Sequence, residues 1–286
     1  MPSQNPPTLL TLPPELRALI YTFLYADLTI THSLPSSNSP GPPTSSIPST
    51  RTALLHTSHL LHHSALPPFL ASATLVFSST ESMLTTLLPL PRHLLTKLRD
   101  VRVTAFPFPL RTDRDMRYYP THSFAAALAL LPGLQLRRLV VEDGFTGSGS
   151  SGTAGGVVTE VGRLLASDGW QELELVTTTG GGAQWAGLAS VGEWDRALKG
   201  RGGKGASVSV WVAGIGEGRE VRLTARRGRG ARIVREGEGE GRSWAEVKGK
   251  GVLEDCERWY YDEEDRAGWL YGGWSRRMQL AVKALR

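Results

Sequence analysis

Two kinds of hydrophobic pattern divide the chain. Near its start, apolar residues recur at helical spacing within 11–25 and again within 51–64, so both segments are predicted to be helices. Further along, short runs rich in Val, Leu and Phe are bounded by turn residues and predict strands. The four strand candidates are 74–78, 100–105, 137–142 and 171–176.

Helical stretches lie between these strand candidates, and this alternation favours a parallel sheet with right-handed crossovers. A spacing of roughly 30 residues between strands is typical of an irregular sheet of the leucine-rich-repeat type with flanking helices. An ordinary open α/β sheet is the alternative. Two later runs, 207–213 and 220–225, alternate on either side of glycines and predict a hairpin.

Composition marks the segments around these elements. Residues 1–8 form a polar, proline-rich tail that is predicted to be disordered, and a Ser/Pro linker at 33–50 interrupts the helical region 9–73. The strand–helix alternation fills 74–176. The Gly/Arg-rich and Trp-rich remainder, 177–286, is expected to pack on the same domain because tryptophans bury large apolar areas.

Charge is unevenly distributed along the chain. The net charge is +5, basic residues gather in 196–235, and acidic residues gather in the adjacent 236–265. This adjacency predicts pairing within the fold, and nucleic-acid binding through 196–235, which includes an arginine–glycine run at 226–232, is the alternative. The single cysteine, Cys256, excludes an internal disulfide framework and fits a reducing compartment. No apolar run is long enough to span a membrane, so we predict a cytoplasmic or nuclear protein without a membrane partner.

Two blocks of sequence carry a family resemblance. Residues 10–24 read LTLPPELRALIYTFL, and residues 54–77 read LLHTSHLLHHSALPPFLASATLVF, a helix that leads into the first strand candidate. Together they resemble a group of uncharacterised filamentous-fungal proteins that open on LLxLPxELRxxIYxxL and are described as F-box-like.

This resemblance implies N-terminal F-box-like helices followed by an irregular, leucine-rich-repeat-like sheet. It also implies a protein-interaction module that is not an enzyme. Such a module is a substrate-recruiting adaptor of a ubiquitin ligase, bound to a Skp-type adaptor and cullin complex and to an unknown protein substrate. The alternative for the first helix is that its apolar side chains are all core. The residues assigned to partner binding are Leu12, Pro13, Leu16, Ile20, Phe23 and Leu24.

The remaining motifs point only weakly to chemistry. Residues 147–152 satisfy GxGxxG between a strand and a helix, which gives a nucleotide-binding enzyme as a third option. His56, His59 and His63 could face one way on a helix and hold a metal ion, but no carboxylate lies within 51–80 to support them. We therefore predict no catalytic, cofactor-binding or metal-binding residues and no cofactor.

Overall fold

The computed structural model describes ten stretches of the chain, and every structural statement below concerns these residues: 9–32, 50–104, 108–109, 118–122, 124–142, 161–177, 190–213, 220–231, 233 and 257–260.

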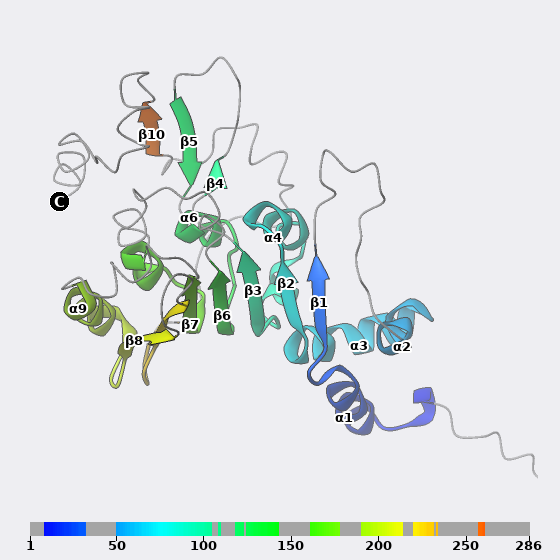
Figure 1. Ribbon diagram of the computed structural model, residues 1–286. Helices are drawn as coiled ribbons and strands as arrows, with labels where there is room; N and C mark the ends of the chain where they lie inside the picture. Colours follow the sequence, from blue (N-terminus) through cyan, green and yellow to red (C-terminus); the bar gives the residue numbers. More distant parts are fainter. Residues whose placement is uncertain are drawn as a thin grey trace, which may run out of the picture.

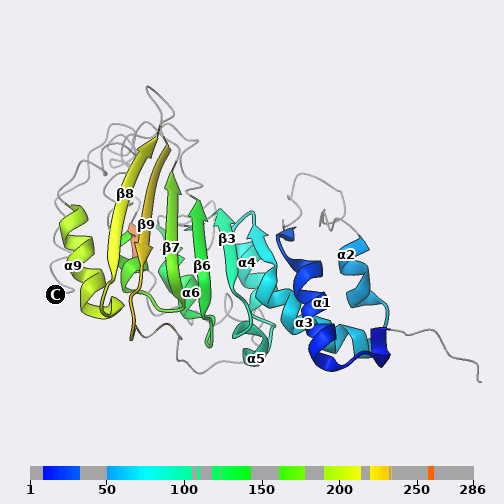
Figure 2. The same cartoon turned by 90° about the horizontal axis from the view of Figure 1, so that it is seen from below.

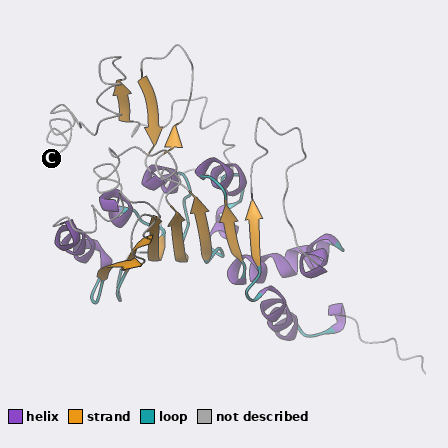
Figure 3. Cartoon of the chain, in the orientation of Figure 1, coloured by secondary structure: helices purple, strands orange, loops and turns teal. Residues whose placement is uncertain are grey.

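Strands from both halves of the chain form one mixed sheet. Its members are β1 (Thr29–His32), β2 (Thr74–Phe77), β3 (Asp100–Thr104), β6 (Leu136–Glu142), β7 (Trp170–Thr177), β8 (Ser207–Ala213) and β9 (Glu220–Arg226). The strands lie in the order β1-β2-β3-β6-β7-β9-β8. The first five pair parallel, whereas β9 pairs antiparallel with both β7 and β8. A separate small antiparallel sheet holds β4 (Phe108–Pro109), β5 (Tyr118–His122) and β10 (Glu257–Tyr260). Figure 3 shows the two sheets in orange.

Helices cover one face of the large sheet and extend beyond its β1 edge. They are η1 (Leu9–Thr11), α1 (Pro14–Tyr25), α2 (Thr50–Ala53), η2 (Leu54–His56), α3 (His59–Ser72), α4 (Thr80–Leu87), α5 (Arg92–Leu95), α6 (Phe124–Ala129), a helix at 161–166 and α9 (Ser190–Gly202). In Figure 1, α4 and α6 lie on one side of the strands, and α1 to α3 lie at the β1 end. In Figure 2, the opposite face of the strands is in front of α6, and α1 to α3 lie beside the sheet. None of the described helices is long and apolar enough to cross a membrane.

Alternation along the strands divides the sheet into an apolar face and a polar face. The register aligns rows of buried residues across neighbouring strands: Val101, Leu139, Leu173 and Ala225 in one row, and Val103, Val141, Leu175 and Leu223 in the next. Phe124, Leu128 and Leu164 from the covering helices belong to the same buried core. The other face carries Arg and Glu side chains and is here called the open face.

The four strand candidates are confirmed as members of one sheet, in which they pair parallel. The predicted hairpin is also confirmed, as β8 and β9. Its second strand lies beside β7, so the hairpin adds two strands to the sheet at the end opposite β1.

The predicted fold class is wrong. N-terminal F-box-like helices do not precede a leucine-rich-repeat-like sheet, because the N-terminal region itself contributes β1 to the sheet and the hairpin makes the sheet mixed. The chain leaves α1 through Asp27, whose φ of 56° is in the left-handed region, and enters β1 at once. The backbone N–H of Thr74 then donates to the carbonyl of Leu28 at 2.8 Å, which joins β2 to this entry. Four residues between a helix and a Ser/Pro stretch give too short a pattern to reveal this strand.

The second predicted helix also differs from the structure. Residues 50–56 form two short pieces, and α3 then runs through Pro67 and Pro68 beyond the predicted end of the helix at 64. Ser58 caps its start, because its side chain accepts a hydrogen bond from the backbone N–H of Leu61 at 3.2 Å. Burial of Phe69 and Leu70 beyond the prolines offsets the hydrogen bonds that the prolines cannot make.

Several predicted segments lie outside the described residues. These are the tail 1–8, the linker over 33–49, the loop that holds 147–152, Cys256 and most of the Trp-rich end of the chain. The division into 9–73, 74–176 and 177–286 stays a prediction.

Candidate docking surface

Two tyrosines fix helix α1 to the rest of the molecule. Tyr21 and Tyr25 lie one turn apart and are fully buried. The Tyr21 hydroxyl lies 3.1 Å from Ser64 Oγ on α3, and the Tyr25 ring meets the Phe69 ring edge-on at 5.2 Å between centroids. Pro14 starts the helix, at a position where a missing N–H has no consequence. The buried side of α1 is therefore aromatic and faces α3.

The opposite side of α1 is an exposed apolar stripe. Leu16, Leu19, Ile20 and Phe23 are 49%, 53%, 41% and 74% exposed. Their spacing of i, i+3, i+4 and i+7 places them within about 100° of the helix circumference, turned away from the tyrosines. None of the four is charged. We call these four residues the α1 stripe.

Two further leucines are exposed near this helix: Leu10, which belongs to η1 just before α1, and Leu60 on α3, which packs against α1. Large apolar side chains that gather at the surface mark an interaction site far more often than single ones do. The α1 stripe gathers four such side chains on one face of a single helix.

The six residues predicted to bind a partner differ in how exposed they are. Leu16, Ile20 and Phe23 belong to the α1 stripe, and Pro13 is exposed just before it. Leu12 is half-buried, and Leu24 packs against the core. Leu19 was missed as a site residue, although its position three residues after Leu16 could have identified it. Whether any of these residues binds a partner stays a prediction.

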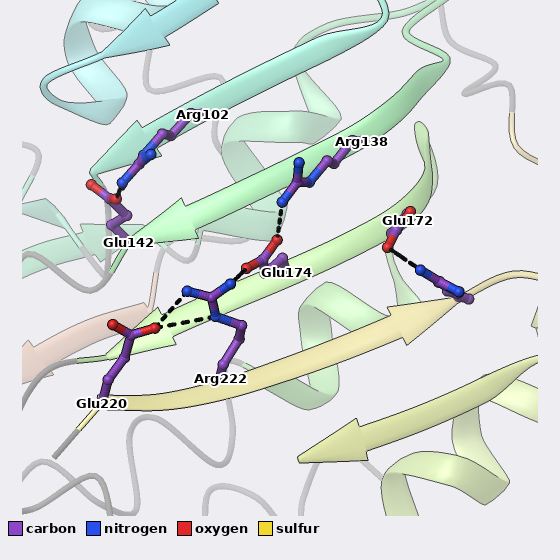
Figure 4. Close-up of polar contacts among 8 residues, drawn as sticks. Arg102, Arg138, Glu142, Glu172, Glu174, Glu220 and Arg222 are labelled. Carbon is purple, nitrogen blue, oxygen red and sulfur yellow. Dashed lines mark hydrogen bonds and ion pairs between the residues drawn. The ribbon is translucent and has the colours of Figure 1, made fainter. Parts of the chain in front are cut away.

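The open face of the sheet is also exposed, but it is polar (Figure 4). At its centre, the Glu174 side chain is only 8% exposed and lies between two arginines. Arg138 on β6 approaches it at 2.6 Å and Arg222 on β9 at 2.8 Å. Arg222 also donates to Glu220 at 2.6 Å, and this hydrogen bond is the main reason that its pKa is raised.

The other arginines of this face are paired in the same way. Arg102 pairs with Glu142 across β3 and β6, and Arg226 donates to Glu172 at 2.9 Å across β9 and β7. At the start of β6, a hydrogen bond from Arg137 to Asp100 raises the pKa of that arginine. The polar face is thus neutralised by its own carboxylates.

A shallow hollow of about 280 Å³ lies at one end of the open face, lined by Arg137, Gln171, Glu172, Arg226 and Arg227. Its arginines pair with carboxylates too, and Arg227 packs on the Trp170 ring at 4.1 Å and lies 3.4 Å from Asp168. Basic residues of 196–235 therefore meet acidic groups of β7 and its surroundings, whereas the predicted partner was the block 236–265. The paired arginines do not favour phosphate binding, which needs cationic groups that the fold leaves available.

The remaining predicted motifs divide between described and undescribed residues. His59 and His63 come together on α3, with 3.0 Å between their Nε2 atoms. Within the described part of the chain, no group of three or more His, Cys, Asp or Glu could hold a metal ion. The GxGxxG loop at 147–152 and Cys256 lie outside the described residues.

No family model and no curated protein matches the chain. Among solved structures, the chain is similar to the crystal structure of the 23S rRNA methyltransferase ErmE. The identity is 12%, the match covers 84% of this chain and 75% of that chain, and the TM-score is 0.26. At this likeness neither the fold nor the activity of the methyltransferase transfers to this chain.

The observed fold corrects the functional predictions. Within the described residues, the expected order of F-box-like helices followed by a repeat-like sheet is not observed, because β1 of the N-terminal region belongs to the mixed sheet. The prediction of an F-box-like adaptor of a ubiquitin ligase is therefore wrong, and the prediction that the chain is not an enzyme is contradicted. Nucleic-acid binding through 196–235 gains no support. A Skp-type and cullin partner and a cytoplasmic or nuclear location stay predictions.

Proposed function

We propose that the chain is a homodimer-forming protein whose docking surface is the α1 stripe, with the same stripe of a second copy as its occupant. The observation that carries this proposal is the exposure of four apolar side chains at helical spacing on a helix that is otherwise firmly anchored. A helix held in place by Tyr21 and Tyr25 presents its outer face without further ordering, which lowers the entropic cost of association.

Self-pairing fits the chemistry of the stripe. A two-fold interface brings the same patch of both copies together, so that patch must be self-complementary. A stripe without charge satisfies this condition, since apolar side chains pack against apolar side chains of either copy. Ridges of residues spaced three and four apart are also the usual contact surface between packed helices.

The charges of α1 favour the antiparallel orientation. Glu15 and Arg17 are the only charged residues of this helix, and both lie in its first half. In an antiparallel pair, the first half of one helix lies beside the uncharged second half of the other. In a parallel pair, each charge would instead lie beside the same charge of the second copy, and like charges repel each other.

The expected affinity is modest. Covering four half-exposed apolar side chains on each copy contributes on the order of 1 kcal/mol per side chain. Association opposes this with roughly 4 kcal/mol or more of lost translational and rotational freedom. With about 8 kcal/mol from the two copies together, the balance is about 4 kcal/mol, which corresponds to a dissociation constant of about 1 mM, so the dimer should form only at high protein concentration.

Sedimentation equilibrium of the full chain tests the proposal. The wild type should move from monomer to dimer with rising concentration, and the double variant Leu19→Glu with Phe23→Glu should stay monomeric. Thr22→Glu changes another exposed position of the same helix, beside the stripe, and should dimerise like the wild type. Circular dichroism checks that all three chains are folded.

Three results would overturn the proposal. The first is a wild type that stays monomeric throughout, which would leave the stripe to another occupant. The second is a dimer that survives the double substitution, which would place the interface elsewhere. The third is a dimer that Thr22→Glu disrupts as strongly as the double variant does.

A further inference from the structure

The first two turns of α3 hold two histidines whose ring nitrogens lie close together. His59 and His63 are one helical turn apart, and their Nε2 atoms are 3.0 Å from each other. The ring centroids are 4.3 Å apart, and both side chains are exposed. A dissolved ion can therefore reach both nitrogens.

The separation of the two Nε2 atoms suits a shared metal ion. Imidazole nitrogens bind first-row transition metals at about 2.0–2.1 Å. Two nitrogens at neighbouring corners of a square around such an ion are then about 2.9 Å apart, and two at corners of a tetrahedron are about 3.3 Å apart. The observed 3.0 Å lies between these values, closer to the square arrangement that Cu²⁺ and Ni²⁺ prefer.

The backbone that carries the pair is well fixed. Ser58 caps the start of α3, and Ala65 and Phe69 anchor its later turns in the core. The neighbouring His62 points elsewhere, since its Nδ1 lies 2.9 Å from the carbonyl oxygen of Leu55. The spacing of His59 and His63 thus follows from a capped, anchored helix.

We propose that His59 and His63 form a surface site for a divalent transition-metal ion, with Cu²⁺ preferred over Ni²⁺ and Zn²⁺. Imidazole is a favoured ligand of all three ions, and Cu²⁺ stands highest in the general order of affinity. Both rings bind through Nε2, each as neutral imidazole, and water completes the coordination. This site is separate from the α1 stripe and does not depend on dimerisation.

The competing explanation for the short contact is a hydrogen bond in which one Nε2–H donates to the other Nε2. Such a pair needs one ring in each tautomer, whereas metal binding needs both Nε2 atoms without a proton. The two explanations differ in what they predict for added metal. Only a metal site predicts that the added ion binds to and stabilises the folded chain.

Calorimetric titration of the full chain with Cu²⁺ tests the proposal, after removal of any purification tag that contains histidine. The wild type should bind one Cu²⁺ per chain with a dissociation constant in the micromolar range. His59→Gln and His63→Gln should each weaken this binding at least tenfold. His62→Gln is the matched control on the same helix and should bind Cu²⁺ as the wild type does.

A spectroscopic measurement keeps the result independent of folding effects. Electron paramagnetic resonance of the Cu²⁺-loaded wild type should show coupling to two imidazole nitrogens, and His63→Gln should reduce this to one. The proposal is overturned if the wild type binds no more tightly than the His59→Gln variant. It is also overturned if His62→Gln removes the site as completely as His63→Gln does, or if the spectrum of the wild type lacks coupling to two imidazoles.

Discussion

The α1 stripe and the open face of the sheet are both exposed, but they differ in whether their side chains are paired within the fold. On the open face, each arginine in a central strand meets a carboxylate of the same or a neighbouring strand. On the stripe, Leu16 and Phe23 are apolar, 49% and 74% exposed, and face solvent. A paired polar face is stable in water as it stands, whereas an apolar stripe gains free energy only when something covers it.

This difference also separates what each surface contributes to folding. Glu174 is nearly buried between Arg138 and Arg222, and its pairs with these arginines offset the cost of burying the carboxylate. Phe23 is mostly exposed, so the fold loses little without it. We expect substitutions on the open face to lower the free energy of unfolding, and substitutions on the stripe to alter association.

The largest expected effect is at the centre of the open face. Glu174→Ala should lower the free energy of unfolding by about 2–3 kcal/mol, because it leaves Arg138 and Arg222 close together without their shared carboxylate. The value is at the low end for such pairs because the two arginine side chains are 52% and 40% exposed and thus partly solvated. Urea denaturation of wild type and variant measures the difference.

Glu142→Ala is the matched control for this substitution. Glu142 is more exposed than Glu174 and pairs with the half-exposed Arg102, so its loss should lower the free energy of unfolding by no more than about 1 kcal/mol. Equal losses in the two variants would show that burial of Glu174 does not set the strength of its pairs.

The polar face was accessible to sequence reasoning and the sheet position of β1 was not. Arg138 and Glu142 lie an even number of residues apart in one strand, as do Glu172 and Glu174 in the next, and strict alternation places each pair on a single face. The four strands themselves were predicted from another pattern, which is their enrichment in Val, Leu and Phe between turn residues. It says nothing of which strands become neighbours, so the insertion of β9 beside β7 could not be anticipated.

The sequence predicted the docking surface only in part, for a different reason. Leucines and tyrosines of α1 are both apolar enough to be buried, so periodicity alone identifies two faces without deciding which one faces the core. The larger Tyr21 and Tyr25 rings fill the space next to α3, which turns Leu16 and Leu19 outwards. Only the shape of the neighbouring helix settles this choice.

The next prediction tests the buried side of α1 by pH. Burial raises the pKa of Tyr25 to about 12, and the nearby Tyr21 adds to this shift. Since the hydroxyl of an unfolded tyrosine ionises near pH 10, the unfolded state is favoured as the pH rises from about 10 to 12. The wild type should therefore lose up to about 2 kcal/mol more than Tyr25→Phe across this interval. Denaturation curves of both chains at a series of pH values measure the loss.

This pH effect should be absent below pH 9, where both states keep the tyrosine protonated. Parallel curves for wild type and Tyr25→Phe up to pH 12 would show that the Tyr25 hydroxyl is already in contact with water and that the buried side of α1 is looser than the structure indicates.

At neutral pH, replacing either tyrosine by phenylalanine should change the free energy of unfolding, in opposite directions for the two positions. Among the described residues, the buried Tyr25 hydroxyl has no hydrogen-bond partner, so Tyr25→Phe should raise the free energy of unfolding by about 1 kcal/mol. Tyr21→Phe removes a contact with Ser64 Oγ and should lower it by a similar amount. Thermal denaturation of the two variants measures the sign of each change. A lower free energy of unfolding in both variants would indicate that Tyr25 has a polar partner.

The smallest expected effect is on the stripe itself. Phe23→Ser should change the free energy of unfolding by no more than about 0.5 kcal/mol when measured at concentrations where the chain is monomeric, because the side chain is already mostly in water. Leu24→Ser, one residue further along, should lower it by about 1–2 kcal/mol because Leu24 packs against the core. The contrast between neighbours removes helix propensity as an explanation, since both changes introduce the same residue into the last turns of α1. If Phe23→Ser is as destabilising as Leu24→Ser, the stripe belongs to the folded core of the monomer, and its exposed side chains no longer distinguish it from the open face of the sheet.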